Sequence, residues 1–388
     1  AMHPDTSIEP GTEDIEALRA RTRAVLRSGD LVAAAALQAS LLARLEAAGA
    51  VPVDDLMHSA LIAFNRQDTT AAYHFMTRAR DAQPDNPLIL WNLAQILVVA
   101  GRFEAALAQA EVALGADPDY FEAHAVLARI HHALGHRAEA REHGEQALLD
   151  ADRRAMGTAA HLPPGPPPPF DAGAPQRNVI AMSLWGDAPR YLDNALANAR
   201  LAPDIYPGWR LRIYCEASTV PTATQHALRD LGCDVRAMPP QRQLYEGLFW
   251  RMLVCAEAGV ARFLMRDADS IFSARERAAV DEWLVSERYF HVMRDHAMQT
   301  DPIQAGLWGG VGGMLPPLPT LLARFTLRQA PTRMVDQVFL AHWVWPTVRQ
   351  SVLVHDSLYR CFGARLFPTT EAPPGGYLGA PAPIPADA

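Results

Sequence analysis

The sequence predicts two folded parts, a helical repeat domain followed by an α/β domain with a mixed, mainly parallel sheet. Three observations carry this prediction. Small residues recur every 34 positions before residue 160, a proline-rich stretch covers 161–176, and short apolar runs then alternate with stretches of helical spacing. Repeats of this length are typical of stacked helix pairs, and strand–helix alternation is typical of a parallel sheet covered on both faces.

Composition narrows the class of protein. The chain has 388 residues, a net charge of -8 and a hydrophobic content of 49%, which suits a soluble protein of two or three domains. An acidic chain argues against a broad nucleic-acid surface, and no run of 18 apolar residues predicts a transmembrane segment. The four cysteines show no Cys-x-x-Cys spacing. We therefore expect a cytoplasmic protein, with peripheral attachment at the inner membrane face as the alternative.

The first 160 residues are predicted to be helical repeats. Several residue pairs and triplets share the 34-residue spacing: Pro84 and Pro118, Gly101 and Gly135, Ala72, Ala106 and Ala140, and Ala79, Ala113 and Ala147. Small side chains let paired helices approach closely, and each pair buries its face by stacking on the next. The pattern resembles the tetratricopeptide repeat over about 53–152, preceded by an irregular helical pair at 12–50. The resemblance implies a domain at 1–160.

The stretch HLPPGPPPPFDAGAPQ at 161–176 is predicted to be a linker. Proline lacks a backbone donor and fixes φ, so neither helix nor sheet continues through it, and an extended polyproline II segment is expected. The α/β domain is placed at 177–370, and a Pro/Gly/Ala-rich tail at 371–388.

The α/β domain is predicted from alternating strands and helices. Strands are expected at 178–184, 209–215, 233–239 and 262–265, and helices at 188–201, 220–231 and 245–258. Open sheets of this kind bind ligands beyond the carboxyl ends of their strands. Polar residues that follow these strands are therefore the first candidates for a site.

An Asp-x-Asp pair occurs three times, and context separates the three. Asp117/Asp119 and Asp150/Asp152 fall at the ends of helix pairs and are predicted to be turn and capping residues. Asp267 and Asp269 follow the fourth predicted strand, at the expected ligand edge. Two carboxylates there can share a hard cation and, through it, a diphosphate. The alternative is a capped turn or a surface salt bridge.

The order of motifs resembles a known enzyme family. FLMRDADSIF is followed by HVMRDHAMQTDPIQAGLWGGVGGML at 291–315, VDQVFL at 335–340 and VLVHDSLY at 352–359. This order is similar to that of glycogenin-like nucleotide-sugar glycosyltransferases, which have the Rossmann-like GT-A fold. The pair MRDH and AGLWGG also resembles bacterial glycosyltransferase-like proteins with tetratricopeptide repeats. The likeness covers roughly 178–368.

The resemblance implies a Mn²⁺ or Mg²⁺ ion and its ligands. Asp269 and His355 would bind the metal directly, and Asp267 would contact the metal or the ribose. Arg251 would meet the diphosphate or brace the metal carboxylates, which suits the fork of a guanidinium. A core or hydrogen-bonding role is the alternative for His355, and a surface position on an amphipathic helix is the alternative for Arg251.

The remaining site residues implied by the resemblance fall into two groups. Nucleotide-sugar contacts are expected from Ser183, Trp185, Glu216, His296, Gly306, Trp308, Gly309 and Gly310, the glycines because they suit an irregular loop that approaches the sugar closely. Catalytic roles are expected for Asp295, Asp336 and Gln337. Asp295 would be the base in an inverting reaction, whereas Asp336 and Gln337 would lie beside the anomeric carbon in a retaining one. Helix capping is the alternative for Asp336.

The predicted activity is sugar transfer from a nucleotide diphosphate sugar, with UDP-sugar as the expected donor, to a hydroxyl of a protein or glycan acceptor. The repeat domain would recognise the acceptor or mediate homo-oligomerisation. One alternative is a non-catalytic repeat scaffold with an inactive transferase-like domain. The other is a sugar-nucleotidyltransferase, although SLWGDAPRY after the first strand lacks the Gly-rich, basic motif usual there.

Overall fold

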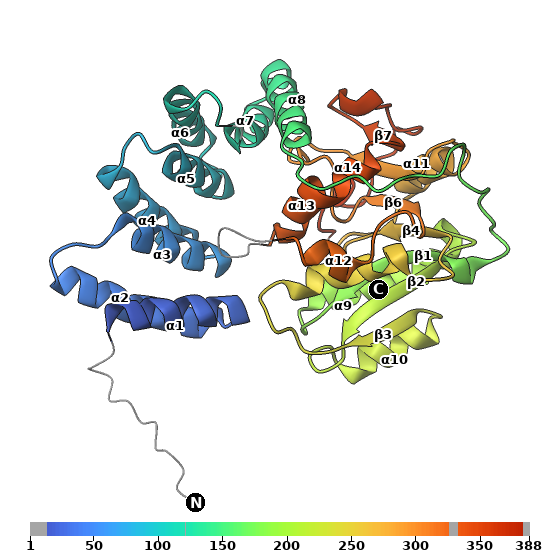
Figure 1. Ribbon diagram of the computed structural model, residues 1–388, viewed down its shortest axis with the longest axis horizontal. Helices are drawn as coiled ribbons and strands as arrows, with labels where there is room; N and C mark the ends of the chain where they lie inside the picture. Colours follow the sequence, from blue (N-terminus) through green and yellow to red (C-terminus); the bar gives the residue numbers. More distant parts are fainter. Residues whose placement is uncertain (1–13, 121, 326–332, 383–388) are drawn as a thin grey trace, which may run out of the picture. The chain divides into compact units, whose positions relative to one another are not determined.

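The computed structural model describes residues 14–120, 122–325 and 333–382. The chain forms two compact units. The first contains the chain up to Leu134 together with the short segment Arg242–Leu244, and the second contains most of the chain from Gly135 onward. Figure 1 labels most of the helices and strands of both units.

The described part of the first unit up to Leu134 folds as successive helices, as the 34-residue period predicts. Its helices are α1 (Ile15–Ser28), α2 (Leu31–Ala47), α3 (Val53–Asn65), α4 (Thr69–Ala82), α5 (Pro87–Val99), α6 (Phe103–Ala116) and α7 (Glu122–Ala133). The recurring alanines Ala72, Ala106 and Ala113 are fully buried. Helices α3/α4 and α5/α6 therefore form the close pairs expected from small residues at this spacing.

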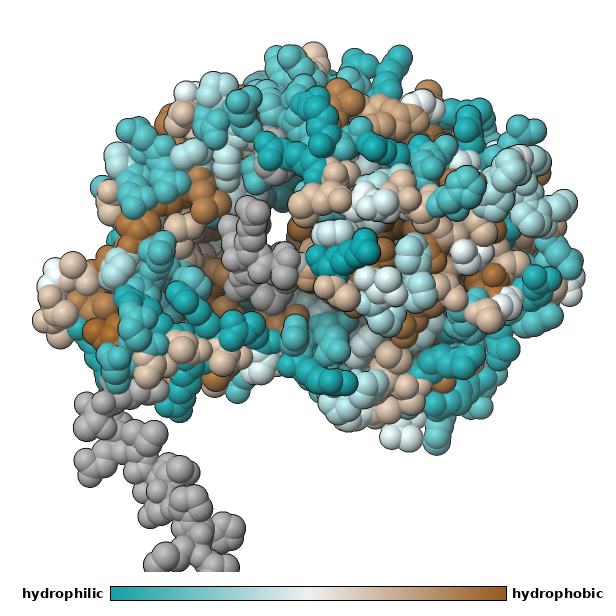
Figure 2. All heavy atoms as spheres, viewed as in Figure 1, coloured by the Kyte–Doolittle hydropathy of each residue, from teal (hydrophilic) through white to brown (hydrophobic). Residues whose placement is uncertain are grey.

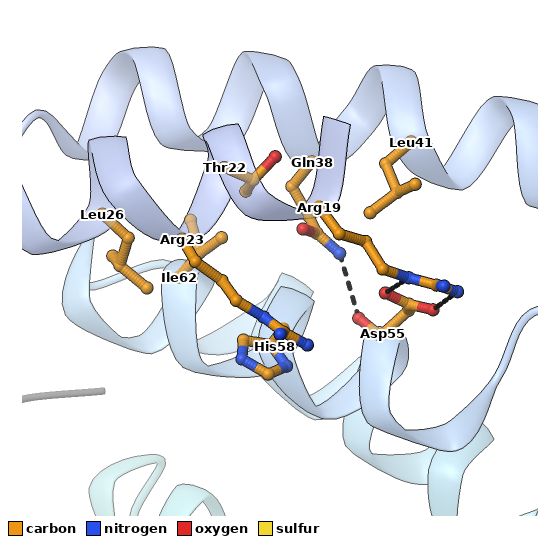
Figure 3. A pocket seen from close by; sticks show the side chains of 9 residues that line it. All are labelled: Arg19, Thr22, Arg23, Leu26, Gln38, Leu41, Asp55, His58 and Ile62. Carbon is orange, nitrogen blue, oxygen red and sulfur yellow. Dashed lines mark hydrogen bonds and ion pairs between the residues drawn. The ribbon is translucent and has the colours of Figure 1, made fainter. Parts of the chain in front are cut away.

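The irregular helices α1 and α2 are fastened to α3 by a buried polar cluster. The guanidinium of Arg19 donates to both carboxylate oxygens of Asp55, at 3.0 and 2.6 Å, and Gln38 Nε2 donates to the Asp55 carbonyl at 3.1 Å (Figure 3). A bidentate pair of this kind fixes orientation as well as distance. It joins the first helical pair to the first repeat.

Helix α8 (Arg137–Arg153) belongs to the second compact unit, which begins at Gly135. The domain boundary near residue 160 stays a prediction. Asp152, predicted to be a turn residue, lies in the last turn of α8 and accepts hydrogen bonds from Trp345 Nε1 at 2.6 Å and Arg349 Nη1 at 2.8 Å. Gly144 of α8 lies against the Tyr359 ring.

In the repeats, Asp117 caps a turn as predicted, because its side chain accepts from Asp119 N at 3.0 Å.

The second unit is built on a seven-stranded sheet of order β3-β2-β1-β4-β6-β5-β7. The strands are β1 (Asn178–Leu184), β2 (Arg210–Glu216), β3 (Asp234–Met238), β4 (Arg262–Met265), β5 (Phe290–Arg294), β6 (Trp308–Val311) and β7 (Val352–Asp356). Strand β6 is antiparallel to β4 and β5, whereas the other neighbouring pairs are parallel. This confirms the predicted mixed, mainly parallel sheet.

Helices enclose two apolar clusters built on the sheet residues. One cluster packs side chains of η2 (Glu246–Ala256) and α13 (Val335–Phe339) against β4, with Phe249, Phe263 and Phe339 among its members. The other packs α9 (Pro189–Ile205), α10 (Thr222–Asp230) and α11 (Ala274–Leu284) against β1 and β2. The helix expected at 245–258 is a 3₁₀ helix. The shorter helices α12 (Leu318–Leu322) and α14 (Trp345–Val348) contribute side chains to the first of these two clusters.

The glycine-rich segment contains a strand, which the sequence analysis did not predict. A Cβ on Gly309 would lie 2.5 Å from the Phe263 carbonyl oxygen, and one on Gly310 would lie 2.6 Å from the Phe290 ring. The glycines thus let β6 fit between aromatic neighbours inside the sheet, which is a packing role.

The predicted linker and tail both pack on the second unit. Arg262 donates to the Pro168 carbonyl, and Phe170 stacks on Trp209 with ring centroids 5.3 Å apart. In the C-terminal segment, Leu378 is buried and Ala382 N donates to the Asp269 carbonyl at 3.0 Å. The segment reaches the carboxyl end of β4.

No helix among the described residues is long and apolar enough to cross a bilayer. Large exposed apolar side chains, such as Val32, Val99, Val285 and Leu366, lie on separate elements. On the face that Figure 2 shows, apolar residues in brown are interspersed with hydrophilic residues in teal. Scattered exposure of this kind is ordinary for folded proteins.

The contact between Gly144 and Tyr359 generates a test of the α8 packing. A Cβ at Gly144 would lie 2.1 Å from Cε1 of Tyr359, whose buried hydroxyl donates to the Ala297 carbonyl at 2.7 Å. We expect Gly144→Ala to lower stability by about 1–3 kcal/mol through overpacking. A Cβ added at Gly115 in α6 would meet no atom within 4 Å, so Gly115→Ala should raise stability by about 0.5–1 kcal/mol through helix propensity. Chemical denaturation of both variants checks this, and a stabilising Gly144→Ala would contradict it.

Candidate functional site

The candidate site lies at the carboxyl ends of β1, β2 and β4. These three strands run parallel, so their ends meet at one edge of the sheet. Residues after β4 supply Asp267 and Asp269, and η2 carries Arg251 to the same edge. The structure therefore brings together several residues that the sequence places far apart.

The Arg251 guanidinium is the centre of the arrangement. Its side chain is only 3% exposed and forms ion pairs with Asp267 and, from Nη2 at 3.0 Å, with Asp336 of α13. Nη1 also donates to the Arg266 carbonyl at 2.9 Å, and the backbone N of Arg251 donates to Ser183 Oγ at 3.1 Å. Arg251 thus joins β1 through its backbone, and the loop after β4 and α13 through its guanidinium.

Asp267 is the accessible carboxylate of the group. Its side chain is 37% exposed, against 3% for Asp336. Gly306 lies directly against it, since a Cβ there would be 2.0 Å from Asp267 Oδ2. Of the predicted glycine-rich loop, Gly306 is the residue that approaches a site carboxylate, and a larger residue there would force the Asp267 side chain to shift.

Gln337 extends the network to an aspartate that the sequence analysis did not single out. Gln337 N donates to Asp336 Oδ1 at 2.9 Å, Gln337 Nε2 donates to Asp301 Oδ2 at 2.8 Å, and Ala305 N donates to Gln337 Oε1 at 2.9 Å. The predicted pair Asp336 and Gln337 therefore lies in the same network as Arg251.

The electrostatics of this network raise the pKa values of Asp336 and Asp301. Burial and, secondarily, the neighbouring Asp267 raise the pKa of Asp336 to about 6 against the pull of Arg251. Burial and the charge of Asp336 raise the pKa of Asp301 to about 6. Like charges in a poorly solvated site oppose joint ionisation. Such tuning is common at functional sites.

Asp269 lies at the same edge and forms an ion pair with a different arginine, Arg190. Its Oδ2 is 3.3 Å from Nη2 of Arg190, near the start of α9, and its carbonyl accepts from Asn194 Nδ2 at 2.9 Å. Burial and the charge of Asp267 raise the pKa of the Asp269 carboxyl. The Arg190 side chain is 45% exposed, which makes it an accessible cation beside the Asp-x-Asp pair.

The structure does not assemble the predicted metal ligands Asp267, Asp269 and His355. Strands β6 and β5 lie between β4 and β7, which separates the strands by roughly 14 Å at the usual spacing. His355 is buried, with Nδ1 2.9 Å from His291 Nε2 and Nε2 3.0 Å from Glu282 Oε2. Its position fits the hydrogen-bonding alternative.

The described residues contain no group of three or more His, Cys, Asp or Glu side chains arranged to hold a metal ion. Arg251 and Arg190 already pair with Asp267 and Asp269. The three-ligand set that the resemblance implies therefore does not fit this geometry.

Both carboxylate oxygens of Asp295, the predicted base, accept hydrogen bonds from other groups of the protein. Its two oxygens accept from Arg275 Nε at 3.1 Å and Nη2 at 2.8 Å, and also from Leu378 N at 3.1 Å and Ser357 Oγ. The carboxylate anchors the C-terminal segment to the end of β5, which argues against the predicted role. The neighbouring His296 ring stacks on Tyr377 with centroids 4.2 Å apart.

The predicted base and ribose contacts are mostly engaged within the protein. Glu216 accepts from Gln241 N at 2.7 Å and from Thr219 Oγ1 at 2.5 Å, which fastens the loops after β2 and β3. Trp185 makes an edge contact with Trp250, and a Cβ on Gly247 would lie 2.7 Å from the Trp185 ring. Trp185 remains partly exposed at the end of β1.

Trp308, Gly309 and Gly310 belong to the sheet rather than to a ligand loop. All three are residues of β6, and the Trp308 ring is 1% exposed and makes an edge contact with Phe263 at 5.2 Å. The expected sugar contacts of these three residues stay a prediction, and their observed role is in the sheet. The three residues lie in the sheet because they form the antiparallel strand β6, which the sequence did not predict.

The raised pKa of Asp336 gives a pH-dependent prediction. An acid whose folded-state pKa exceeds its unfolded value stabilises the fold below the unfolded pKa and loses that contribution as pH rises through the folded pKa. For Asp336 this window runs from about pH 4 to about 6. Relative to the parent, Asp336→Asn should gain stability between pH 4 and pH 7, by up to about 3 kcal/mol for a two-unit shift.

Urea unfolding of parent and Asp336→Asn at both pH values measures this difference. Asp119→Asn, in an exposed turn of the repeats, is the control and should show no such trend. A stability difference between Asp336→Asn and the parent that stays constant from pH 4 to pH 7 would contradict the raised pKa.

Comparison with known proteins identifies the helical repeats. The tetratricopeptide repeat family profile matches residues 59–121 and 92–155, and curated protein sequences give no match. Among solved structures, MamA of strain MSR-1 has 21% identity and a TM-score of 0.34 over 38% of this chain and 83% of its own. The Sgt2 TPR domain of Aspergillus fumigatus has 28% identity and a TM-score of 0.25, and the match covers 25% of this chain and 65% of that domain's chain.

A mutant O-GlcNAc transferase of Thermobaculum terrenum has 21% identity and a TM-score of 0.40 over 58% of this chain, which spans 41% of that protein. Likeness at these scores does not extend to function. The profile match agrees with the helix pairs α3/α4 and α5/α6 and with the 34-residue period. Residues 59–155 of this chain therefore form tetratricopeptide repeats.

Proposed function

We propose that the second unit binds a nucleotide diphosphate sugar at the carboxyl ends of β1 and β4 and transfers the sugar to an acceptor hydroxyl. The observation that carries the proposal is the buried Arg251 between Asp267 and Asp336. It gathers an accessible carboxylate, a buried carboxylate and a glycine that permits close approach at the ligand edge of the sheet.

The charges at this edge suit a diphosphate. Arg190 is partly exposed and pairs with Asp269 at 3.3 Å, a longer contact than the Arg251–Asp336 pair at 3.0 Å. An incoming diphosphate would compete with Asp269 for this guanidinium, whose fork matches phosphate oxygens. Arg251 is buried and doubly paired, so we assign it to holding Asp267 and Asp336 in place.

The cofactor prediction of Mn²⁺ or Mg²⁺ stays a proposal in a narrower form. It rests on Asp267 and Asp269 without His355, because His355 lies at β7 with Glu282 and His291. A hard divalent ion would supply additional positive charge to the leaving diphosphate. Titration of the nucleotide with and without Mn²⁺ decides whether these two carboxylates use one.

The reacting sugar would lie beside Asp336 and Gln337. Asp336 accepts a hydrogen bond from Arg251 at one carboxylate oxygen and from Gln337 N at the other. These two bonds fix the orientation of its negative charge. A charge fixed in advance stabilises a developing oxocarbenium-like state more than a mobile one. With Asp295 engaged by Arg275, this arrangement favours retention over base-assisted inversion.

We further propose that the repeat unit recognises a protein or glycan acceptor or mediates self-association, as repeats with extended surfaces commonly do. The rival function is a repeat scaffold whose α/β unit binds no nucleotide. Binding measurements separate these functions before any acceptor is known.

Nucleotide binding gives the direct test. Calorimetric titration of the parent with UDP and GDP, with and without Mn²⁺, should detect at least one complex. In the presence of Mn²⁺, Asp269→Asn should weaken it by about tenfold or more because a proposed metal ligand is lost. Asp119→Asn, the matched change in a repeat Asp-x-Asp pair, should bind like the parent. Failure of every nucleotide to bind would favour the scaffold.

Gly306 provides a second test of the same site. Gly306→Ala places a methyl group 2.0 Å from the present position of Asp267 Oδ2, so the Asp267 carboxylate must shift from its present position. We expect nucleotide affinity to fall by about tenfold or more because the preorganised charges are displaced. Gly115→Ala is the control glycine in open space. Unchanged affinity in Gly306→Ala would place the nucleotide elsewhere.

A further inference from the structure

The orientation of the Gln337 amide is set by its two neighbours. Its Nε2 lies 2.8 Å from Asp301 Oδ2, and its Oε1 lies 2.9 Å from Ala305 N. An ionised carboxylate can only accept and a backbone N–H can only donate, so a single amide orientation satisfies both. A flipped amide would set oxygen against oxygen and N–H against N–H.

Asp301 reaches the candidate site through this amide. Gln337 N holds Asp336 Oδ1 at 2.9 Å, while Ala305 N, held by Gln337 Oε1, precedes Gly306. Gly306 in turn lies against Asp267 Oδ2. Asp301 is therefore linked to Asp336 through Gln337, and to Gly306 through Gln337 and Ala305.

The segment that carries Asp301 is itself fixed. Gln304 Nε2 donates to the Asp301 carbonyl at 3.2 Å, and Arg294 Nη1 donates to the Pro302 carbonyl at 2.9 Å. Arg294 also pairs with Asp356 at 2.7 Å. The Asp301 carboxylate thus has a defined place between β5 and β6, from which it faces Gln337.

One buried donor of the network lacks a partner. Nε of Arg251 is buried without a hydrogen bond among the described residues, while both terminal nitrogens are engaged. Buried polar groups are normally satisfied, and an exception calls for an explanation such as a functional role. This observation is independent of the acidic side chains.

We infer that Asp301 is a positioning residue for sugar transfer, which fixes the Gln337 amide and thereby holds Asp336 and the Ala305–Gly306 backbone beside Asp267. The inference rests on the proposed function of the same site. Asp301 itself touches neither donor nor acceptor in this account. It acts through hydrogen bonds, so what matters is an acceptor atom at its position.

Two substitutions separate positioning from simple packing. Asp301→Asn keeps an oxygen that can accept from Gln337 Nε2, whereas Asp301→Ala removes it. With the nucleotide sugar that the parent consumes, Asp301→Ala should lower kcat by about 10- to 100-fold through misplacement of the reacting groups, with KM changed less than about twofold. Asp301→Asn should restore most of kcat.

A second measurement does not depend on activity. In protein labelled with ¹⁵N in glutamine side chains, the Gln337 amide resonances, identified by their absence in Gln337→Leu, should shift in Asp301→Ala and return toward the parent position in Asp301→Asn. Asp119→Ala is the control and should leave them unchanged. This spectrum reports the local hydrogen bond directly.

The outcomes separate this inference from the proposed function. A parent protein that consumes no nucleotide sugar would overturn the proposed function and with it the role of Asp301 in transfer. Turnover by Asp301→Ala equal to the parent, an equal loss in Asp301→Asn and Asp301→Ala, or an unmoved Gln337 amide would overturn the positioning role alone. Shifted resonances together with the kcat loss and its rescue would support it.

Discussion

The architecture of the candidate site depends on one buried cation. Arg251 holds Asp267 on the loop after β4 and Asp336 on α13, two carboxylates 69 positions apart in the chain. Removing one partner of a buried charge pair leaves an uncompensated charge, which costs about 3–5 kcal/mol in comparable cases. The same guanidinium therefore links the fold of the second unit to the geometry of its ligand edge.

Glycine makes the second contribution, by removing side-chain volume where the backbone must come close. Gly306 brings the segment before β6 against Asp267, while Gly309 and Gly310 let β6 fit between Phe263 and Phe290. In the segment AGLWGGVGGML, Gly306 thus lies at the candidate site, whereas Gly309 and Gly310 pack inside the sheet. Its glycine content alone does not separate these roles, because both need close backbone approach.

Periodicity predicted the repeat helices and the four strands from β1 to β4 because each signal is local. The 34-residue spacing and the apolar runs express which face of each element is buried. Strand β6, the 3₁₀ geometry of η2 and the packed C-terminal segment depend on contacts between distant residues. The site shows the same division: Asp267 follows from its strand end, whereas His355 was placed by motif order, which carries no information on the two strands between β4 and β7.

The position of the donor is the central claim, and a crystal structure of the protein with a bound nucleoside diphosphate tests it most directly. We predict density for the diphosphate at the carboxyl ends of β1 and β4, within contact of Arg190 and beside Asp267, with Arg251 still between Asp267 and Asp336. A nucleotide bound elsewhere on the chain, or bound at this edge with Arg251 released from both carboxylates, would contradict the account.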